Sequence, residues 1–170
     1  MARHIITNLN QLDSIIGKVI EEEIAKFGEE VKKALQMEVR SIFYGREGYH
    51  PNAEETAYYK RTWQLIECIT CSPVKVSGNK YSVKIYYDTD KLIPMQGEGG
   101  YFPSHMSVVD GRPFQEGLPY TIEYGNPSRI YGWEAFHIVE NLRNRLADDK
   151  AILQWFVSAF KRRGFNVIED

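Results

Sequence analysis

The N-terminal part of the chain carries apolar residues at intervals of three and four positions without a break. The run opens at Asn10 and Asp13, whose types and spacing are typical of a helix start. Its apolar members are Leu12, Ile15, Ile16, Val19, Ile20, Ile24, Phe27, Val31, Leu35, Val39 and Ile42. This period predicts one amphipathic helix about 45–50 Å long. Because a domain of 170 residues does not need so long a helix to cover its core, part of the stripe is expected to meet another subunit. A bent helix packed wholly on its own sheet is the alternative.

The opposite face of this helix is charged. Its members are Lys18, Glu21, Glu22, Lys26, Glu29, Lys32, Lys33 and Arg40. The i,i+4 pairs Glu22–Lys26 and Glu29–Lys33 are expected to stabilise it. The three consecutive glutamates at 21, 22 and 23 are interpreted as a solvated face.

A loop with Gly45, Gly48 and Pro51 comes next, and helical spacing then returns. Thr62 is the expected N-cap of this short second helix, because its hydroxyl can accept backbone N–H groups one turn further on. The apolar positions of the helix are Trp63, Leu65, Ile66 and Ile69.

Residues 74–87 alternate between apolar and polar, which predicts a β-hairpin with its turn at Ser77, Gly78 and Asn79. Residues 88–119 show no sustained period and are expected to form a long irregular loop. Residues 118–126 are predicted to be a third strand that ends at Gly125. A helix is expected near residues 133–146, and a last helix is expected to be capped by Asp148 and ended by Gly164 and Phe165. The final residues, 165–170, could add a short strand.

This order predicts a single α+β domain over residues 1–170, with the long N-terminal helix and the C-terminal helices packed on a small antiparallel sheet. The charges nearly cancel, with 21 Lys and Arg against 23 Asp and Glu, so no general affinity for DNA phosphates is expected. Two cysteines, no leader and no apolar run near 18 residues are typical of a protein of a reducing compartment, neither secreted nor inserted into a membrane.

Few residues suggest catalysis or metal binding. Cys68 and Cys71 form a C-x-x-C at a predicted helix C-terminus, which favours two small, partly buried side chains over a redox pair. Asp88, Asp90 and His105 could hold a metal, although acidic residues after a strand are ordinary in turns. The basic run Lys161, Arg162 and Arg163 suits a helix C-terminus, with a phosphate contact as the alternative. We expect no cofactor, no metal and no enzymatic activity.

The loops are rich in aromatic residues, which bring large contact area at low entropic cost and are enriched at interfaces together with arginine. Scattered core aromatics are the alternative. The residues expected at an interface are Tyr59, Arg61, Thr62, Trp63, Tyr101, Phe102, Phe114, Arg129 and Tyr131.

Several pieces of residues 44–126 resemble the tail-completion or head–tail joining (neck) proteins of tailed bacteriophages. In those proteins a long N-terminal amphipathic helix precedes a tyrosine-rich loop that enters Y-x-R-T-x-x-L. A hairpin that ends in an aspartate follows, and later a strand that ends in E-Y-G-N. The matching residues here are Tyr59, Arg61, Thr62, Leu65, Ile69, Asp88, Glu123, Tyr124 and Gly125. Trp63 departs from the family, which usually has a small residue there, and the stretch between Thr89 and Leu118 is longer than the family's.

The resemblance implies a structural subunit of the virion, made in the host cytoplasm and placed at the head–tail junction. Copies would form a ring, with six-fold symmetry or a multiple of it, between the portal-side connector and the tail proteins. DNA would pass through the lumen without specific binding, and no membrane would be involved. Arg61 is the expected anchor within the ring or the subunit. A soluble protein- or ligand-binding module and a metal-assisted hydrolase using Asp88, Asp90 and His105 are the alternatives.

Overall fold

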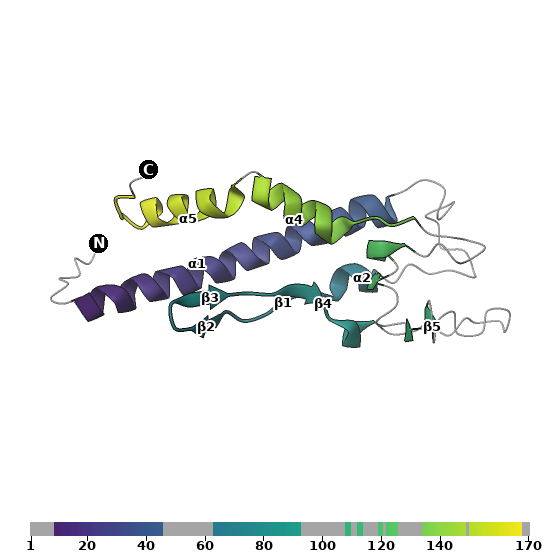
Figure 1. Cartoon of the computed structure of the whole chain (residues 1–170), viewed down its shortest axis with the longest axis horizontal. Helices are drawn as coiled ribbons and strands as arrows, with labels where there is room; N and C mark the ends of the chain where they lie inside the picture. Colours follow the sequence, from purple (N-terminus) through teal and green to yellow (C-terminus); the bar gives the residue numbers. More distant parts are fainter. Residues whose placement is uncertain are drawn as a thin grey trace.

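The computed structural model describes residues 9–45, 63–92, 108–109, 112–113, 119–120, 122–125, 134–148 and 150–167. Helix α1 (Leu9–Glu38) runs along the length of the molecule and continues into the π-helical turn η1 (Val39–Tyr44). In Figure 1 the C-terminal helices lie along one flank of α1 and the strands β1 to β4 along another. The α+β class predicted from the sequence is confirmed. No described helix combines the length and the apolar character that crossing a membrane requires.

Helix α1 confirms the long N-terminal helix. Its stripe is buried at Val19 and Leu35 and continues into η1 at Val39 and Phe43. The ion pairs expected along its polar face are wrong, because the lysines pair one residue closer. Lys26 bonds to Glu23, Lys32 to Glu29 and Lys33 to Glu30, all at i,i+3, over distances of 2.7 to 3.0 Å.

The second helix is shorter than expected. Helix α2 covers only Gln64–Glu67, and Ile69 belongs to strand β1 (Ile69–Cys71) instead. The helix ends here because the backbone from Cys68 onward pairs with strand β4 and its neighbours. The amide of Asp88 donates to the carbonyl of Cys68 at 2.7 Å. The expected cap, Thr62, lies outside the described residues, and Trp63 occupies the N-cap position with φ 57°.

The strands form one long antiparallel ribbon, which confirms the hairpin and extends it. Strand β2 (Lys75–Ser77) pairs with β3 (Lys80–Ser82) across the turn at Gly78, where φ is +59°, and β1 pairs with β4 (Ile85–Tyr87). Between the two ladders, residues 72–74 face only residues 83–84. This bulge holds Pro73, which cannot donate to a ladder.

Two glycines on one face of α1 let the ribbon approach the helix. A Cβ on Gly17 would stand 2.7 Å from the Tyr81 hydroxyl, and one on Gly28 would stand 2.9 Å from Cys71 Sγ and 3.1 Å from the Val83 methyls. Eleven residues separate the glycines, which is close to three helical turns, so both lie under the ribbon.

The stretch expected to be one irregular loop, residues 88–119, contains some regular structure. The 3₁₀ turn η2 (Thr89–Lys91) follows β4, and strands β5 (Val108–Val109) and β6 (Arg112–Pro113) pair antiparallel.

The third strand predicted at residues 118–126 is wrong, because residues 119–120 and 122–124 are helical. Ile122 packs in the core and Glu123 bonds to the next helix, which fixes this turn as a helical one. Gly125, with φ +75°, ends this helical turn and not a strand.

Helices α4 (Ile138–Asp148) and α5 (Ala151–Arg162) confirm the two C-terminal helices. The cap expected from Asp148 is wrong, because Asp148 ends α4 and Lys150, with φ 49°, precedes α5.

Helix α5 is ended by Gly164 and Phe165, as expected from the sequence. The amides of Gly164 and Phe165 donate to the carbonyls of Lys161 and Phe160, a Schellman motif closed by the Phe160–Phe165 ring contact at 5.4 Å. Residues 165–167 form no strand, and 168–170 lie outside the described part.

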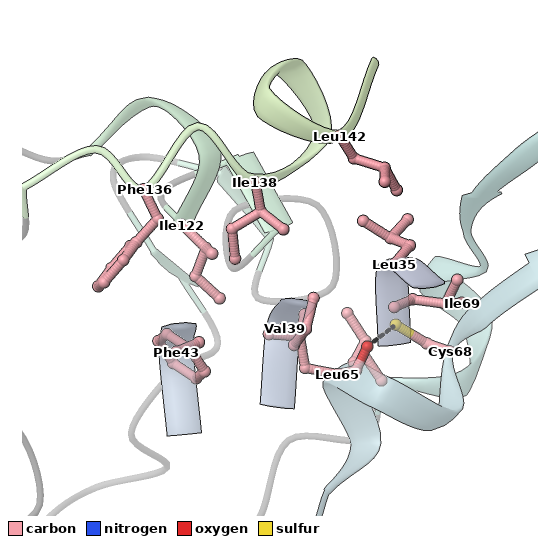
Figure 2. Packing of buried hydrophobic residues seen from close by; sticks show 11 residues of the cluster. Leu35, Val39, Phe43, Leu65, Cys68, Ile69, Ile122, Phe136, Ile138 and Leu142 are labelled. Atoms are coloured by element: carbon pink, nitrogen blue, oxygen red, sulfur yellow. Dashed lines mark hydrogen bonds between the residues drawn. The ribbon is translucent and has the colours of Figure 1, made fainter. Parts of the chain in front are cut away.

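The hydrophobic core gathers around the C-terminal half of α1 and η1. Figure 2 shows Phe136, Ile122 and Ile138 lying over Phe43 and Val39, with Leu65, Cys68 and Ile69 beside Leu35. Burial of each large apolar side chain contributes about 1.5–3 kcal/mol. The core residues are Leu35, Val39, Phe43, Leu65, Cys68, Ile69, Leu92, Ile122, Phe136, Ile138 and Leu142.

Candidate functional site

Of the residues expected at an interface, the structure describes one. Trp63 is 37% exposed, and the guanidinium carbon of Arg40 lies 5.8 Å from the centre of its ring, a cation–π distance. Trp63 also starts α2, since its carbonyl accepts the amides of Ile66 and Glu67. The other expected residues lie outside the described part of the chain: Tyr59, Arg61, Thr62, Tyr101, Phe102, Phe114, Arg129 and Tyr131.

The structure contains an apolar groove that the sequence did not predict. Val31 and Leu35 of α1 form its floor, β4 lines one side, and α4 with the start of α5 lines the other. Its volume is about 530 Å³. The lining residues, called the groove residues below, are Val31, Leu35, Ile85, Tyr86, Tyr87, Val139, Leu142, Arg143, Leu146, Ala147 and Ile152.

The rim of this groove exposes large apolar side chains. Tyr86, Val139 and Ile152 are 45%, 40% and 49% exposed, and the neighbouring Leu153 is exposed as well. Among the described residues that line the groove, Arg143 alone is charged. Contiguous exposed apolar surface marks sites where proteins bind partners or ligands, so the groove is the candidate functional site.

Each wall of the groove had a local signal in the sequence. Val139, Leu142 and Leu146 follow helical spacing, and Ile85 and Tyr87 alternate with Tyr86. These local patterns do not predict the angle at which α4 and the ribbon pack on α1. Sequence reasoning missed the site because the groove exists only where four separate elements, α1, β4, α4 and α5, converge.

A partly buried group of ion pairs holds α5 against α1. Arg163 donates to Glu22 at 2.7 Å and to Glu23 at 2.8 Å. Glu23 is therefore not part of a solvated face, and its side chain is only 3% exposed. The basic end of α5 meets these carboxylates of α1. Burial alone would raise the pKa of Glu23, but the hydrogen bonds from Lys26 and Arg163 outweigh it and lower the pKa. Nearby, the rings of Phe27 and Trp155 meet edge to face at 5.6 Å.

Glu123 and Tyr124, which carry part of the resemblance, have different surroundings. The buried carboxylate of Glu123 accepts the amides of Val139 and Glu140 at 3.0 and 3.1 Å, so it caps the start of α4 from another segment. Tyr124 is 59% exposed, and its ring lies 4.8 Å from that of Tyr120. The two tyrosines form a second exposed aromatic surface.

The residues considered for metal binding or redox chemistry do not form a site in the described part. Asp88 pairs with Lys91 at 3.1 Å, and His105 lies outside the described residues. No group of three or more His, Cys, Asp or Glu side chains there could hold a metal ion.

The cysteines match the interpretation as small, partly buried side chains. Both are free thiols, Cys68 buried and Cys71 partly so. Burial, with the charge of Asp88 adding to it, raises the pKa of Cys68 to about 12, and burial with the charge of Glu29 raises that of Cys71. Both thiols are therefore protonated at neutral pH and are poor nucleophiles.

No family model matches the chain, and neither the curated proteins nor the solved structures gave a match to it.

Proposed function

We propose that this chain is a structural subunit of a bacteriophage head–tail connector, the neck. Copies of it would form a ring around the DNA conduit, with six-fold symmetry or a multiple of it, and join the tail to the portal-side connector. In this role the protein is a virion component at the head–tail junction, made in the host cytoplasm, without catalytic activity, cofactor or metal. The resemblance of the residues around Arg61 and Glu123 to neck proteins motivates this assignment.

The open apolar groove is the observation that supports an assembly role. A single copy leaves Tyr86, Val139 and Ile152 about half exposed around the groove. Burying such a surface against a neighbouring connector or tail protein removes apolar area from water, which is the main favourable term in association. Assembly would therefore cover what the isolated fold leaves open.

The charge balance suits a conduit. The chain has a net charge of -2, so a ring of copies adds no strong attraction for DNA phosphates. DNA could slide through such a lumen without being held.

Electron microscopy of the native particle tests the proposal. The expected result is a closed ring of this chain between the portal-side connector and the tail. A neck in which density for this chain is absent would contradict the proposal.

A matched pair of variants tests whether the groove serves assembly. Val139→Asp places a charge on the groove wall at a half-exposed site, so it should block docking of the chain onto the neighbouring connector or tail protein while the melting temperature of the isolated chain changes little. Ser158→Asp, at an exposed position of α5 away from the groove residues, should leave this docking intact.

A soluble ligand-binding module is the second candidate, because a volume of about 530 Å³ lies within the range of pockets that hold small ligands. An apolar fluorescent probe that binds saturably at one site per chain, and loses binding in Val139→Asp, would favour this candidate when no ring forms.

A further inference from the structure

The hydrogen-bond pattern of the ribbon determines which backbone groups of β4 point outward. The amide of Asp88 donates to the carbonyl of Cys68, and the amide of Ser72 donates to the carbonyl of Lys84. Opposed residues in an antiparallel ladder alternate between bonded and non-bonded pairs. Thr70 and Tyr86 are therefore a bonded pair, because they lie midway between those two. The N–H and C=O groups of Ile85 and Tyr87 must point away from β1.

This outward edge borders the groove. All three residues of β4 are groove residues, and none of β1 is. In the described part of the chain, no backbone group outside the β1–β4 pair bonds to Ile85 or Tyr87. An edge with unpaired N–H and C=O groups is a template for another strand.

The shape and chemistry of the groove suit an extended segment. A strand laid along β4 would direct every second side chain to the apolar floor at Val31 and Leu35 and toward Leu142 and Leu146 of the α4 wall. Its other side chains would face outward beside Tyr86. The backbone pairing would give affinity, and the apolar positions would give specificity.

Charge indicates which strand would fit. Arg143 is exposed and, among the described residues, has no carboxylate within ion-pair distance, whereas the nearby Arg145 is paired with Glu38. An acidic strand would be complementary.

We propose that the outer edge of β4 binds an extended strand of a partner protein, with apolar side chains at alternate positions in the groove and a carboxylate that pairs with Arg143. This inference rests on the proposed function, because it names the chemistry of the partner that docks on the assembling subunit. The bound strand would pair with β4 and become the third strand beside β1 and β4.

Selection from a random octapeptide library on the full chain tests the inference. The expected peptides have apolar residues at every second position and Asp or Glu at one outward position. The variant Arg143→Glu should select Lys or Arg at that position instead. Methylating alternate backbone nitrogens of a selected peptide should abolish binding for one set of positions and spare the other, because only one set faces β4.

Amide hydrogen exchange of the full chain locates the contact. The selected peptide should slow exchange at Ile85 and Tyr87 by about tenfold or more while Tyr86, already bonded to β1, changes little. Failure to enrich any peptide, helical spacing of the apolar positions, or an acidic preference unchanged in Arg143→Glu would overturn the inference. Slowed exchange at Ile85 and Tyr87 caused by self-association alone would also overturn it, since the occupant would then be a second copy.

This experiment separates the two proposals. A ring in the native particle together with failed peptide selection would leave the proposed function standing and remove the strand. Successful selection without a ring would keep the strand site and remove the connector role.

Discussion

Arg163 at the end of α5 donates a hydrogen bond of 2.8 Å to Oε1 of Glu23 in α1, across 140 residues of sequence. Lys26 bonds the same oxygen at 2.9 Å. The other oxygen, Oε2, is buried and has no hydrogen-bond partner among the described residues, although Arg162 lies 3.8 Å away. This carboxylate is thus a buried charge whose cost is offset by neighbouring cations, and it ties the last helix to the first.

Glu23→Gln should destabilise the chain by about 1–3 kcal/mol, because Lys26 and Arg163 would then donate to a neutral amide oxygen and lose their ion pairs with the buried carboxylate. Denaturant unfolding measures the change. Glu21→Gln, at an exposed position of the same helix, is the matched control and should be nearly neutral. Equal stability of the two variants would show that the Arg163 contact does not hold α5.

The same pair predicts how stability depends on pH. The pKa of Glu23 in the folded chain lies below its ordinary value of 4.5, so the carboxylate stabilises the fold above pH 4.5. The contribution is lost as the pH falls through the lowered pKa of the folded state. The difference in melting temperature between the wild type and Glu23→Gln should therefore stay constant near neutral pH and shrink below pH 4.5. A difference that grows in acid would contradict the pairing.

Two glycine substitutions in α1 should have opposite effects. Alanine favours a helix interior over glycine by about 1 kcal/mol. At Gly28 the added Cβ meets Cys71 and two methyls of Val83, and overpacking of this kind costs about 1–3 kcal/mol, so Gly28→Ala should destabilise. At Gly17 the neighbour is the hydroxyl end of Tyr81, which can move, so Gly17→Ala should be neutral or stabilising. Thermal unfolding of both variants checks this, and a stabilised Gly28→Ala would mean that the ribbon does not lie where the structure has it.

Elements defined by short-range signals were predictable from the sequence. The apolar period of α1 repeats over eight turns, the hairpin turn carries Gly78, and Gly164 with Phe165 ends α5 through bonds to residues three and five positions back. Each of these depends on residues close together in the chain, so a local pattern was sufficient.

The errors occurred where distant partners determine the structure. Strand β1 exists because β4 pairs with it, and residues 122–124 are helical where Glu123 reaches across to α4. The starts of α2, α4 and α5 follow Trp63, His137 and Lys150, all with positive φ and none of a usual capping type. The groove could not be predicted for the same reason, because it depends on how α4 and the ribbon are placed on α1.

Thiol labelling should distinguish the two cysteines. At pH 8 both are protonated, since burial raises the pKa of Cys68 to about 12 and also raises that of Cys71. A disulfide reagent should react slowly with the partly exposed Cys71 and with Cys68 only after unfolding, and the denatured chain should titrate as two thiols. Rapid labelling of Cys68 in the native chain would show that the junction of α2 and β1 opens locally.

Glu123→Ala should loosen the start of α4 and, with it, one wall of the groove. Removing the carboxylate leaves the amides of Val139 and Glu140 without their acceptor, and loss of a helix cap costs about 0.5–2 kcal/mol. Hydrogen exchange should speed up at these two amides and hardly change in α5. Glu134→Ala, at an exposed position ahead of α4, is the control and should leave both amides protected.

Because Val139 is a groove residue, Glu123→Ala should also weaken the binding of a partner strand in the groove. Unchanged exchange at Val139 would show that α4 forms its first turn without Glu123, and that the groove wall does not depend on it.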